Sequence, residues 1–231
     1  GNTQLAALGN YVWEDLNANG LQDDGATGIN NVTVRLLKDT DNNGTPDTVV
    51  DTQLTGDDPD TAGTQQGYYK FTGLTPGVAY QVELVKPAAV GPEAYPFPAQ
   101  DRGANDATAS DANPATGRSQ VVTLTSGQYN DTVDAGLYRN GSIHGFGFLD
   151  INGNGIQDGG DSAFPDNPGK TLVLTGPGGV QTVTTVSGKA NWTSLKPGTY
   201  TIVESPVPAG YQLTTLPNLR TVVVDSGKEY V

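Results

Sequence analysis

Hydrophobic and polar residues alternate along many short stretches of this 231-residue chain, and turn-forming residues separate the stretches. A period of two predicts half-buried β-strands, because successive side chains of a strand point to opposite faces of the sheet. No stretch of eleven residues keeps the i, i+3, i+4, i+7 apolar spacing of an amphipathic helix. The pattern therefore predicts an all-β protein.

The alternating stretches fall into two groups along the chain. The first group predicts strands at 8–14, 31–37, 48–54, 67–72, 79–85, 119–124 and 131–138. The second group predicts strands at 143–149, 170–175, 180–186, 189–193, 199–204 and 220–224. Short alternating strands with turn signals between them are typical of antiparallel β-sandwiches.

The chain also repeats itself. "DLNANGLQDDGA" (15–26) returns 135 positions later as "DINGNGIQDGGD" (150–161). Two more matches follow in the same order: "GLTPGVAYQVEL" (73–84) with "SLKPGTYTIVES" (194–205), and "RSQVVTLTSGQYN" (118–130) with "RTVVVDSGKEYV" (220–231). Internal repetition predicts two related domains, 1–139 and 141–231. The segment 88–117, rich in Ala, Pro and Asp, is read as a long loop inserted in the first domain.

The closing strand of the first domain, within "DTVDAGLY" (131–138), has no counterpart before Val231. We therefore expect the second domain to lack its last strand and to leave a β-edge open, and an open edge can pair with another chain. The apolar leader "TQLAAL" (3–8) is a candidate donor for such pairing between copies.

Three segments have the ligand spacing of an EF-hand-type loop, with oxygen ligands at positions 1, 3, 5, 7, 9 and 12 and glycine at position 6. Loop one (15–26) supplies Asp15, Asn17, Asn19, Leu21 through its carbonyl, and Asp23. Loop two (39–50) supplies Asp39, Asp41, Asn43, Thr45 through its carbonyl, and Asp47. Loop three (150–161) supplies Asp150, Asn152, Asn154, Ile156 through its carbonyl, Asp158 and Asp161.

Calcium is the expected ion, because it takes six to eight oxygen ligands, whereas Mg²⁺ keeps several waters in a strict octahedron. Position 12 is Ala26 in loop one and Val50 in loop two, so each lacks a ligand. Water or a carboxylate from elsewhere could fill the gap, and Asp106, Asp111 and Asp134 are the candidates. The alternative is that these Asp-Asn-Gly runs are only turns.

Twelve basic and 25 acidic residues give a net charge of −13, which argues against nucleic acid and anionic membranes as partners. The chain has no cysteine, so disulfides and thiolate metal sites are excluded. No apolar run approaches the length that crosses a bilayer. An acidic, Cys-free chain rich in Gly and Thr is typical of bacterial surface proteins.

"LGNYVWEDLNANGLQDDG", "GINNVTVRLL" and "TVDAGLY" resemble the B repeats of staphylococcal Sdr surface proteins, the SdrD B-like domains of the wider Cna B-type group. The likeness covers nearly all of the first domain and the first two-thirds of the second. It implies Ig-like or prealbumin-like sandwiches, bound calcium, an extracellular location and a role as a stalk, spacer or fibre module. Ala26 departs from the family pattern of an acid at position 12, and the Asp-rich segment 103–117 is similar to one in many such domains.

The same resemblance raises the question of an internal isopeptide bond, which Cna B-type domains often form between Lys and Asn or Asp beside a Glu. "YTIVESPVPAGY" (200–211) would place that Glu at Glu204, and Lys170 is a candidate amine. The usual acceptor lies on the last strand, which is missing here. The residues alone read as a strand-end acid and a solvated lysine.

Two further residue types bear on function. Trp13 and Trp192 lie in alternating strands and are expected in the core, and His144, the one histidine, has no nucleophile context. We therefore expect no enzyme activity. The sequence favours a calcium-binding extracellular structural module. The alternatives are a subunit of a self-assembling filament and an adhesion module for host protein or glycan.

Overall fold

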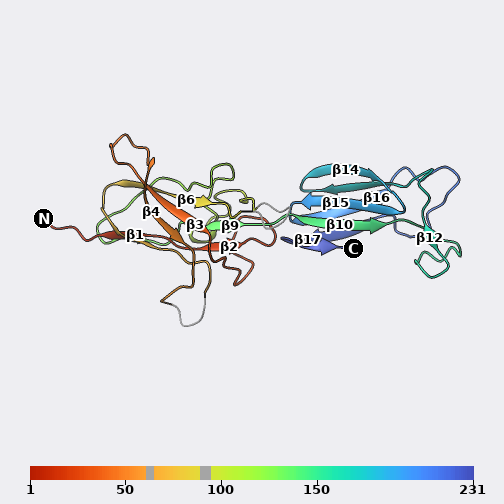
Figure 1. Ribbon diagram of the computed structural model, residues 1–231, viewed down its shortest axis with the longest axis horizontal. Helices are drawn as coiled ribbons and strands as arrows, with labels where there is room; N and C mark the ends of the chain where they lie inside the picture. The colour runs from red at the N-terminus through yellow and green to blue at the C-terminus, as the bar shows by residue number, and fades with distance from the viewer. Residues whose placement is uncertain (61–64, 89–94) are drawn as a thin grey trace. The chain divides into compact units, whose positions relative to one another are not determined.

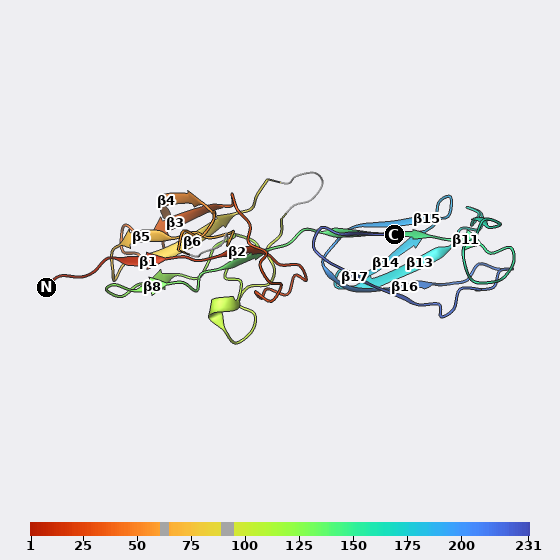
Figure 2. The same ribbon diagram turned by 90° about the horizontal axis from the view of Figure 1, so that it is seen from below.

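The computed structural model describes residues 1–60, 65–88 and 95–231. The chain divides into two compact units, Gly1–Arg139 and Asn140–Val231, and each is a β-sandwich (Figures 1 and 2). The predicted all-β class is confirmed, because the helical structure of the described ranges is one 3-10 turn, η1 (Asp106–Thr108), in the inserted loop. Nothing in these ranges forms a helix long and apolar enough to span a bilayer.

The first domain packs a four-stranded antiparallel sheet against shorter strands. The sheet has the order β4 (Thr48–Leu54), β3 (Thr33–Lys38), β6 (Ala79–Val85) and β7 (Val122–Thr123). The opposite layer has the order β5 (Phe71–Leu74), β1 (Ala6–Leu8) and β8 (Tyr129–Asn130), continued by β2 (Val12–Glu14) and β9 (Ala135–Leu137).

The core of this sandwich follows from the alternation in the sequence. In β6, Tyr80, Val82 and Leu84 are buried and the residues between them are partly exposed. They pack against Leu8 and Phe71 of the opposite layer, together with the buried part of β3 and the inserted loop's Phe97. Burial of one face of each strand therefore fixes the register, since a slip of one residue would expose every core side chain.

The predicted strand 8–14 is in fact two strands, β1 and β2. The Gly9 N–H donates to the Asn130 carbonyl, whereas the Tyr11 N–H donates to the Asp134 carboxylate, so the chain changes partner at this point from β8 to β9. The apolar leader is also not free for donation to a neighbour. Its residues Ala6–Leu8 are β1, with Leu8 fully buried between β5 and β8.

The second domain repeats this arrangement. Its four-stranded sheet has the order β14 (Gly179–Thr184), β13 (Thr171–Gly176), β16 (Gly198–Glu204) and β17 (Arg220–Val224). Facing it are β15 (Lys189–Leu195), β10 (Gly141–Phe146) and β18 (Glu229–Tyr230), with a separate pair of β11 (Phe148–Leu149) and β12 (Ser162–Ala163).

One strand of the first domain has no equivalent in the second. β18 pairs in parallel with β10 as β8 pairs with β1. By the repeat, β11 is the counterpart of β2, yet within residues 140–231 it pairs with β12 and nothing stands in the place of β9. Within residues 140–231 the edge of β11 opposite β12 therefore carries no partner strand.

Candidate metal-binding loops and a buried ion pair

The three Asp-rich loops share one backbone geometry, set by the aspartate at position 1. Each of these carboxylates accepts the backbone N–H groups of positions 5 and 6, and Asp150 also accepts that of Gly153 at position 4. The distances are 3.2 and 2.8 Å for Asp15, 3.2 and 2.8 Å for Asp39, and 3.2 and 2.7 Å for Asp150. The glycines at position 6 have φ of +83°, +89° and +76°, which explains why the sequence keeps glycine there.

The side chains at positions 3, 5 and 9 converge in loop three. Both Asn152 and Asn154 direct their Nδ2 groups to the same Asp158 oxygen, at 2.8 and 3.0 Å. Asn152 also accepts the Asn154 N–H, and Asn154 accepts the Ile156 N–H. These side-chain-to-backbone bonds form successive Asx turns, which bend the loop around a common centre.

Loop one closes in a way that the sequence pattern missed. In loop three, the position-12 acid Asp161 accepts the N–H of Ile151 at 3.0 Å. In loop one, Asp24 accepts the equivalent N–H of Leu16 at 2.8 Å, so Asp24 takes the structural place that Ala26 leaves vacant. The paired acids at 23 and 24 were the only signal for this in the sequence, and fixed spacing could not identify it.

Loop two is the least closed of the three. Asp41 and Asn43 are bound to each other at 2.9 Å beside Asp39. The carboxylate of Asp47 instead accepts the hydroxyl of Thr48 at 3.0 Å. Asp39, Asp41, Asn43 and Thr45 are therefore neighbours in loop two. Asp47 is instead bound to Thr48, the first residue of β4.

The position-1 aspartates of loops one and three have pKa values shifted in opposite directions, because Asp15 is buried more deeply than Asp150. Burial raises the pKa of the fully buried Asp15 to about 6, despite the N–H bonds that it accepts. For Asp150, burial also raises the pKa, but the N–H groups of Gly155 and Gly153 and the Thr214 side chain outweigh it, so the net pKa is lowered. Neighbouring N–H groups likewise lower the pKa of Asp158.

A buried carboxylate pair lies beside loop one, where the inserted loop meets the closing strand. Asp111 accepts the Asp134 N–H at 2.7 Å, and the Asp134 carbonyl accepts the Asp111 N–H at 2.8 Å. Asp111 is 5% exposed and Asp134 is 1% exposed. One oxygen of Asp134 accepts the Tyr11 N–H, while its buried Oδ2 makes no hydrogen bond of normal geometry and the Gln22 side chain is a polar neighbour of the carboxylate.

Burial is the largest influence on both members of this pair. It raises the pKa of Asp111 to about 7 and that of Asp134 to about 8, with the charge of Asp111 adding to the rise for Asp134. Two buried carboxylates with little compensation are costly when ionised, so a cation between them would relieve the cost. Asp106, the third candidate, lies on η1 and accepts the Thr132 hydroxyl at 2.9 Å on the surface.

The donor atoms fit a hard divalent cation. In the described ranges no three Asp, Glu, His or Cys side chains stand close enough together to hold a metal by themselves. Each loop instead combines a few carboxylates with amide and carbonyl oxygens, which is the mixed oxygen set that calcium accepts. The buried Asp134 Oδ2, which makes no hydrogen bond of normal geometry, is a second observation that suits a cation.

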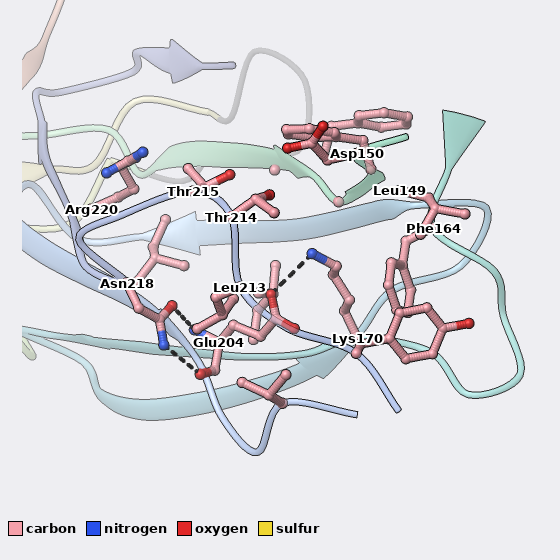
Figure 3. Close-up of a pocket in the computed structure, with 18 of the residues that line it drawn as sticks. Leu149, Asp150, Phe164, Lys170, Glu204, Leu213, Thr214, Thr215, Asn218 and Arg220 are labelled. Atoms are coloured by element: carbon pink, nitrogen blue, oxygen red, sulfur yellow. Dashed lines mark hydrogen bonds and ion pairs between the residues drawn. The ribbon is translucent and has the colours of Figure 1, made fainter. Parts of the chain in front are cut away.

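Lys170 and Glu204 form an ion pair in the second domain, with 3.0 Å between Nζ and Oε2 and side chains 16% and 8% exposed. Figure 3 shows this pair among the residues that line a pocket of about 290 Å³, where Asn218 also holds the Glu204 backbone through two hydrogen bonds. The aromatic ring of Phe164 lies 4.8 Å from the Lys170 ammonium. The expectation of a solvated lysine is therefore wrong, because most of its side chain is buried and its ammonium is paired with Glu204.

Comparison with known proteins agrees with this architecture. The SdrD B-like domain model matches residues 6–137, and a prealbumin-like fold domain model matches residues 166–231. Serine-aspartate repeat-containing protein D of Staphylococcus aureus (strain Newman) is 33% identical over 223 residues. Protein F of Staphylococcus epidermidis (strain ATCC 12228) is 33% identical over 226 residues. Each alignment covers 95% of this chain, but only 15% and 12% of the respective relative.

Two solved structures illustrate the more distant likeness. The Bacillus anthracis TIE protein is 15% identical, with a TM-score of 0.35, over 98% of this chain and 33% of that one. A D295N mutant of the shaft pilin SpaA from Lactobacillus rhamnosus GG is 14% identical, with a TM-score of 0.32, over 99% of this chain and 96% of that one. These scores are too low to carry an argument. The match of the SdrD B-like model to more than half of the sequence shows that the chain belongs to the SdrD B-like domain family.

Proposed function

We propose that this chain is a calcium-binding extracellular spacer, whose loops become rigid connectors between strands when the ion binds. The observation that carries the proposal is the shared geometry of the three loops. Asp15, Asp39 and Asp150 each gather the N–H groups of positions 5 and 6 in the same way, although loop two lies outside the sequence repeat. Turns selected only for chain reversal would not need the same three-dimensional arrangement.

The bonds within each loop leave room for a cation. A carboxylate or amide oxygen has two lone pairs, so acceptance of one N–H does not use up its capacity. In loop three, Asp150, Asn152, Asn154, Asp158 and the Ile156 carbonyl would hold the ion, with Asp161 closing the loop at position 12. In loop one, Asp15, Asn17, Asn19, Asp23 and the Leu21 carbonyl would do so, with Asp24 closing the loop.

Loop two offers Asp39, Asp41, Asn43 and the Thr45 carbonyl, and Asp47 would have to turn from Thr48 to join them. The buried pair of Asp111 and Asp134 is a further place for a cation in the first domain. Bound calcium supplies positive charge that offsets repulsion among ionised carboxylates. The net charge of −13 makes this offset important for the whole chain.

Thermal unfolding of metal-stripped protein, with and without added calcium, tests the proposal. One site that binds only the folded state stabilises it by about 2.7 kcal/mol at a hundredfold excess of calcium over Kd. The midpoint should therefore rise by several degrees with calcium and far less with magnesium. Native mass spectrometry under the same conditions counts the ions. An unchanged midpoint with no added mass would refute calcium binding.

A variant pair separates loop binding from general charge. Asp150→Ala removes the position-1 carboxylate of loop three, whereas Asp51→Ala removes an equally negative side chain on the exposed strand β4. We expect Asp150→Ala to lose one calcium ion and Asp51→Ala to keep all of them. Equal loss in both variants would mean that calcium is held only by the diffuse negative charge.

A second candidate function is acceptance of an extended peptide strand by the second domain. In the first domain, β9 lies along β2 and packs on Trp13, since a Cβ on Gly136 would lie 3.1 Å from the Trp13 ring. In the second domain, the pocket of Figure 3 adjoins Phe148, the counterpart of Trp13. The expected occupant is a peptide strand with small and apolar side chains like those of β9, and it would run parallel to β11.

Calorimetric titration with a peptide of the sequence 131–138 tests this second function, and a scrambled peptide of the same composition is the control. Strand addition requires saturable binding of the first peptide alone. Absence of heat at every peptide concentration, or equal heat from both peptides, would count against it.

A further inference from the structure

Loop three contains two consecutive Asn–Gly steps, Asn152–Gly153 and Asn154–Gly155, on an exposed part of the surface. Asn–Gly is the dipeptide most open to spontaneous deamidation, because glycine has no side chain to hinder approach of its nitrogen to the asparagine side chain. The chain places three more such steps elsewhere: Asn19–Gly20 in loop one, Asn43–Gly44 in loop two and Asn140–Gly141 at the start of the second domain.

The reaction has two balanced steps. The glycine backbone nitrogen loses its proton to solvent and bonds to Cγ of the asparagine. The bond from Cγ to the side-chain nitrogen breaks, and that nitrogen takes up a proton from solvent and leaves as ammonia, which closes a five-membered succinimide. Water then opens the ring to aspartate or isoaspartate. The glycine nitrogen must therefore be free to turn toward Cγ, and the asparagine side chain must be free to present it.

In the structure both the glycine nitrogens and the asparagine side chains are held by hydrogen bonds. The Asp150 carboxylate holds the glycine nitrogens. Its Oδ1 accepts the Gly153 N–H at 2.7 Å, and its Oδ2 accepts the Gly155 N–H at 2.7 Å. One side chain thus engages the attacking nitrogen of both steps. Hydrogen bonds to an ionised acceptor are stronger than neutral ones, so each attack must first break a strong bond.

The asparagine side chains are held as well. Each Oδ1 accepts an N–H two residues further on, and each Nδ2 donates to Asp158. These contacts keep Cγ in an Asx turn and away from the following nitrogen. They also hold the leaving nitrogen at a carboxylate.

We propose that Asn152 and Asn154 are latent sites of spontaneous deamidation, which the Asp150 carboxylate holds in check by binding the N–H groups of Gly153 and Gly155. The aspartate at position 1 then has a chemical role that does not depend on any bound ion. Without it, new carboxylates and isoaspartate linkages would accumulate at positions 3 and 5, and the longer isoaspartate backbone would break the Asx turns.

The test compares Asp150→Ala with Asp161→Ala in metal-stripped protein, incubated in warm, mildly alkaline buffer. Both variants remove one carboxylate from loop three, but Asp161 holds the N–H groups of Ile151 and Asp158, neither of which follows an asparagine. Peptide mapping locates the mass gained when NH₂ becomes OH, and an isoaspartyl methyltransferase assay counts isoaspartate. Asn140–Gly141 serves as the reference site within the same molecule.

We expect Asp150→Ala to deamidate at Asn152 and Asn154 about tenfold faster than the unmodified chain, the factor given by loss of one hydrogen bond to a charged group. Asp161→Ala and the reference site should keep their rates. The proposal is overturned if Asp150→Ala deamidates no faster at these two residues, or if Asp161→Ala accelerates them equally, since general loosening of the loop would then explain the change.

Discussion

The Lys170 ammonium lies 3.0 Å from the Glu204 carboxylate, and both side chains are largely enclosed by the second sandwich. Strand register identifies their counterparts in the first domain. In the first domain Val34 pairs with Leu84, and in the second domain Leu172 pairs with Glu204. Glu204 therefore occupies the position of Leu84. Lys170, two residues before Leu172, occupies the position of Val32, two residues before Val34. A pair of apolar core positions in one domain has become an ion pair in the other.

Removal of one partner of this pair should destabilise the second domain. Glu204→Leu leaves the Lys170 charge enclosed without compensation, which costs about 3 kcal/mol. The double variant Lys170→Val/Glu204→Leu restores the first domain's pair of residues and should recover most of the loss. Urea unfolding monitored by Trp192 fluorescence measures both. A double variant as unstable as the single one would contradict this account.

The buried pair of Asp111 and Asp134 predicts an unusual pH dependence for the first domain without metal. Burial raises both pKa values, to about 7 and about 8, above the ordinary value of 3.8. Above the ordinary value the unfolded chain releases these protons while the folded domain keeps them, so the free energy of unfolding falls as pH rises from about 4 to about 8. Thermal unfolding of resin-stripped protein at several pH values measures this.

Calcium should reverse that slope, because a bound cation favours the ionised carboxylates. Asp134→Asn, which cannot ionise, should flatten the slope in metal-free protein. Metal-free stability that stays level or rises from pH 4 to pH 8, and that Asp134→Asn leaves unchanged, would contradict raised pKa values for this pair.

Asp24 should contribute to calcium affinity although its position does not match the loop pattern. Asp24→Asn keeps an acceptor for the Leu16 N–H but removes the charge, so it isolates the electrostatic effect. Calcium affinity depends on the number of charged ligands, and we expect binding at loop one to weaken about tenfold. Calorimetric titration measures this, with Asp57→Asn as a surface control. Equal affinities in the two variants would remove Asp24 from the site.

Gly67 should tolerate no side chain. Its φ is +85°, and a Cβ would lie 2.1 Å from the Val12 carbonyl oxygen. Gly77, in the turn between β5 and β6, has a similar φ of +78° and open space around it. Gly77→Ala should therefore cost only the left-handed strain of about 1 kcal/mol. Gly67→Ala should cost several times more, because backbone must move. Chemical denaturation compares the two, and equal losses would contradict the clash.

The sequence predicted the parts of this fold that depend on local pattern. Alternation located β3, β6 and β16 to within about two residues, because their buried positions follow the two-residue period. It also located β4, although none of the residues in β4 is buried. The break between β1 and β2 could not be found in this way. It depends on the Asp134 carboxylate, 123 positions away in the sequence, which accepts the Tyr11 N–H.

The loops show the same division. The position-1 aspartates could be predicted, because their bonds to positions 5 and 6 lie within six residues. The role of Asp24 in closing loop one could not be predicted. It depends on the three-dimensional path that brings Asp24 next to the Leu16 N–H, and not on a fixed sequence spacing. The family resemblance singled out Lys170 and Glu204 together, but their burial could not be predicted from the residues, because charge normally indicates the surface and the enclosure depends on strand register.

The parallel pairing of the first domain's end strands has a mechanical consequence. The chain enters through β1 and β2 and leaves through β8 and β9, and these strands lie alongside each other in parallel. Tension on the two ends therefore pulls the paired strands lengthwise in opposite directions. Their hydrogen bonds bear this shear together instead of parting one at a time, so the domain should yield late and abruptly when stretched.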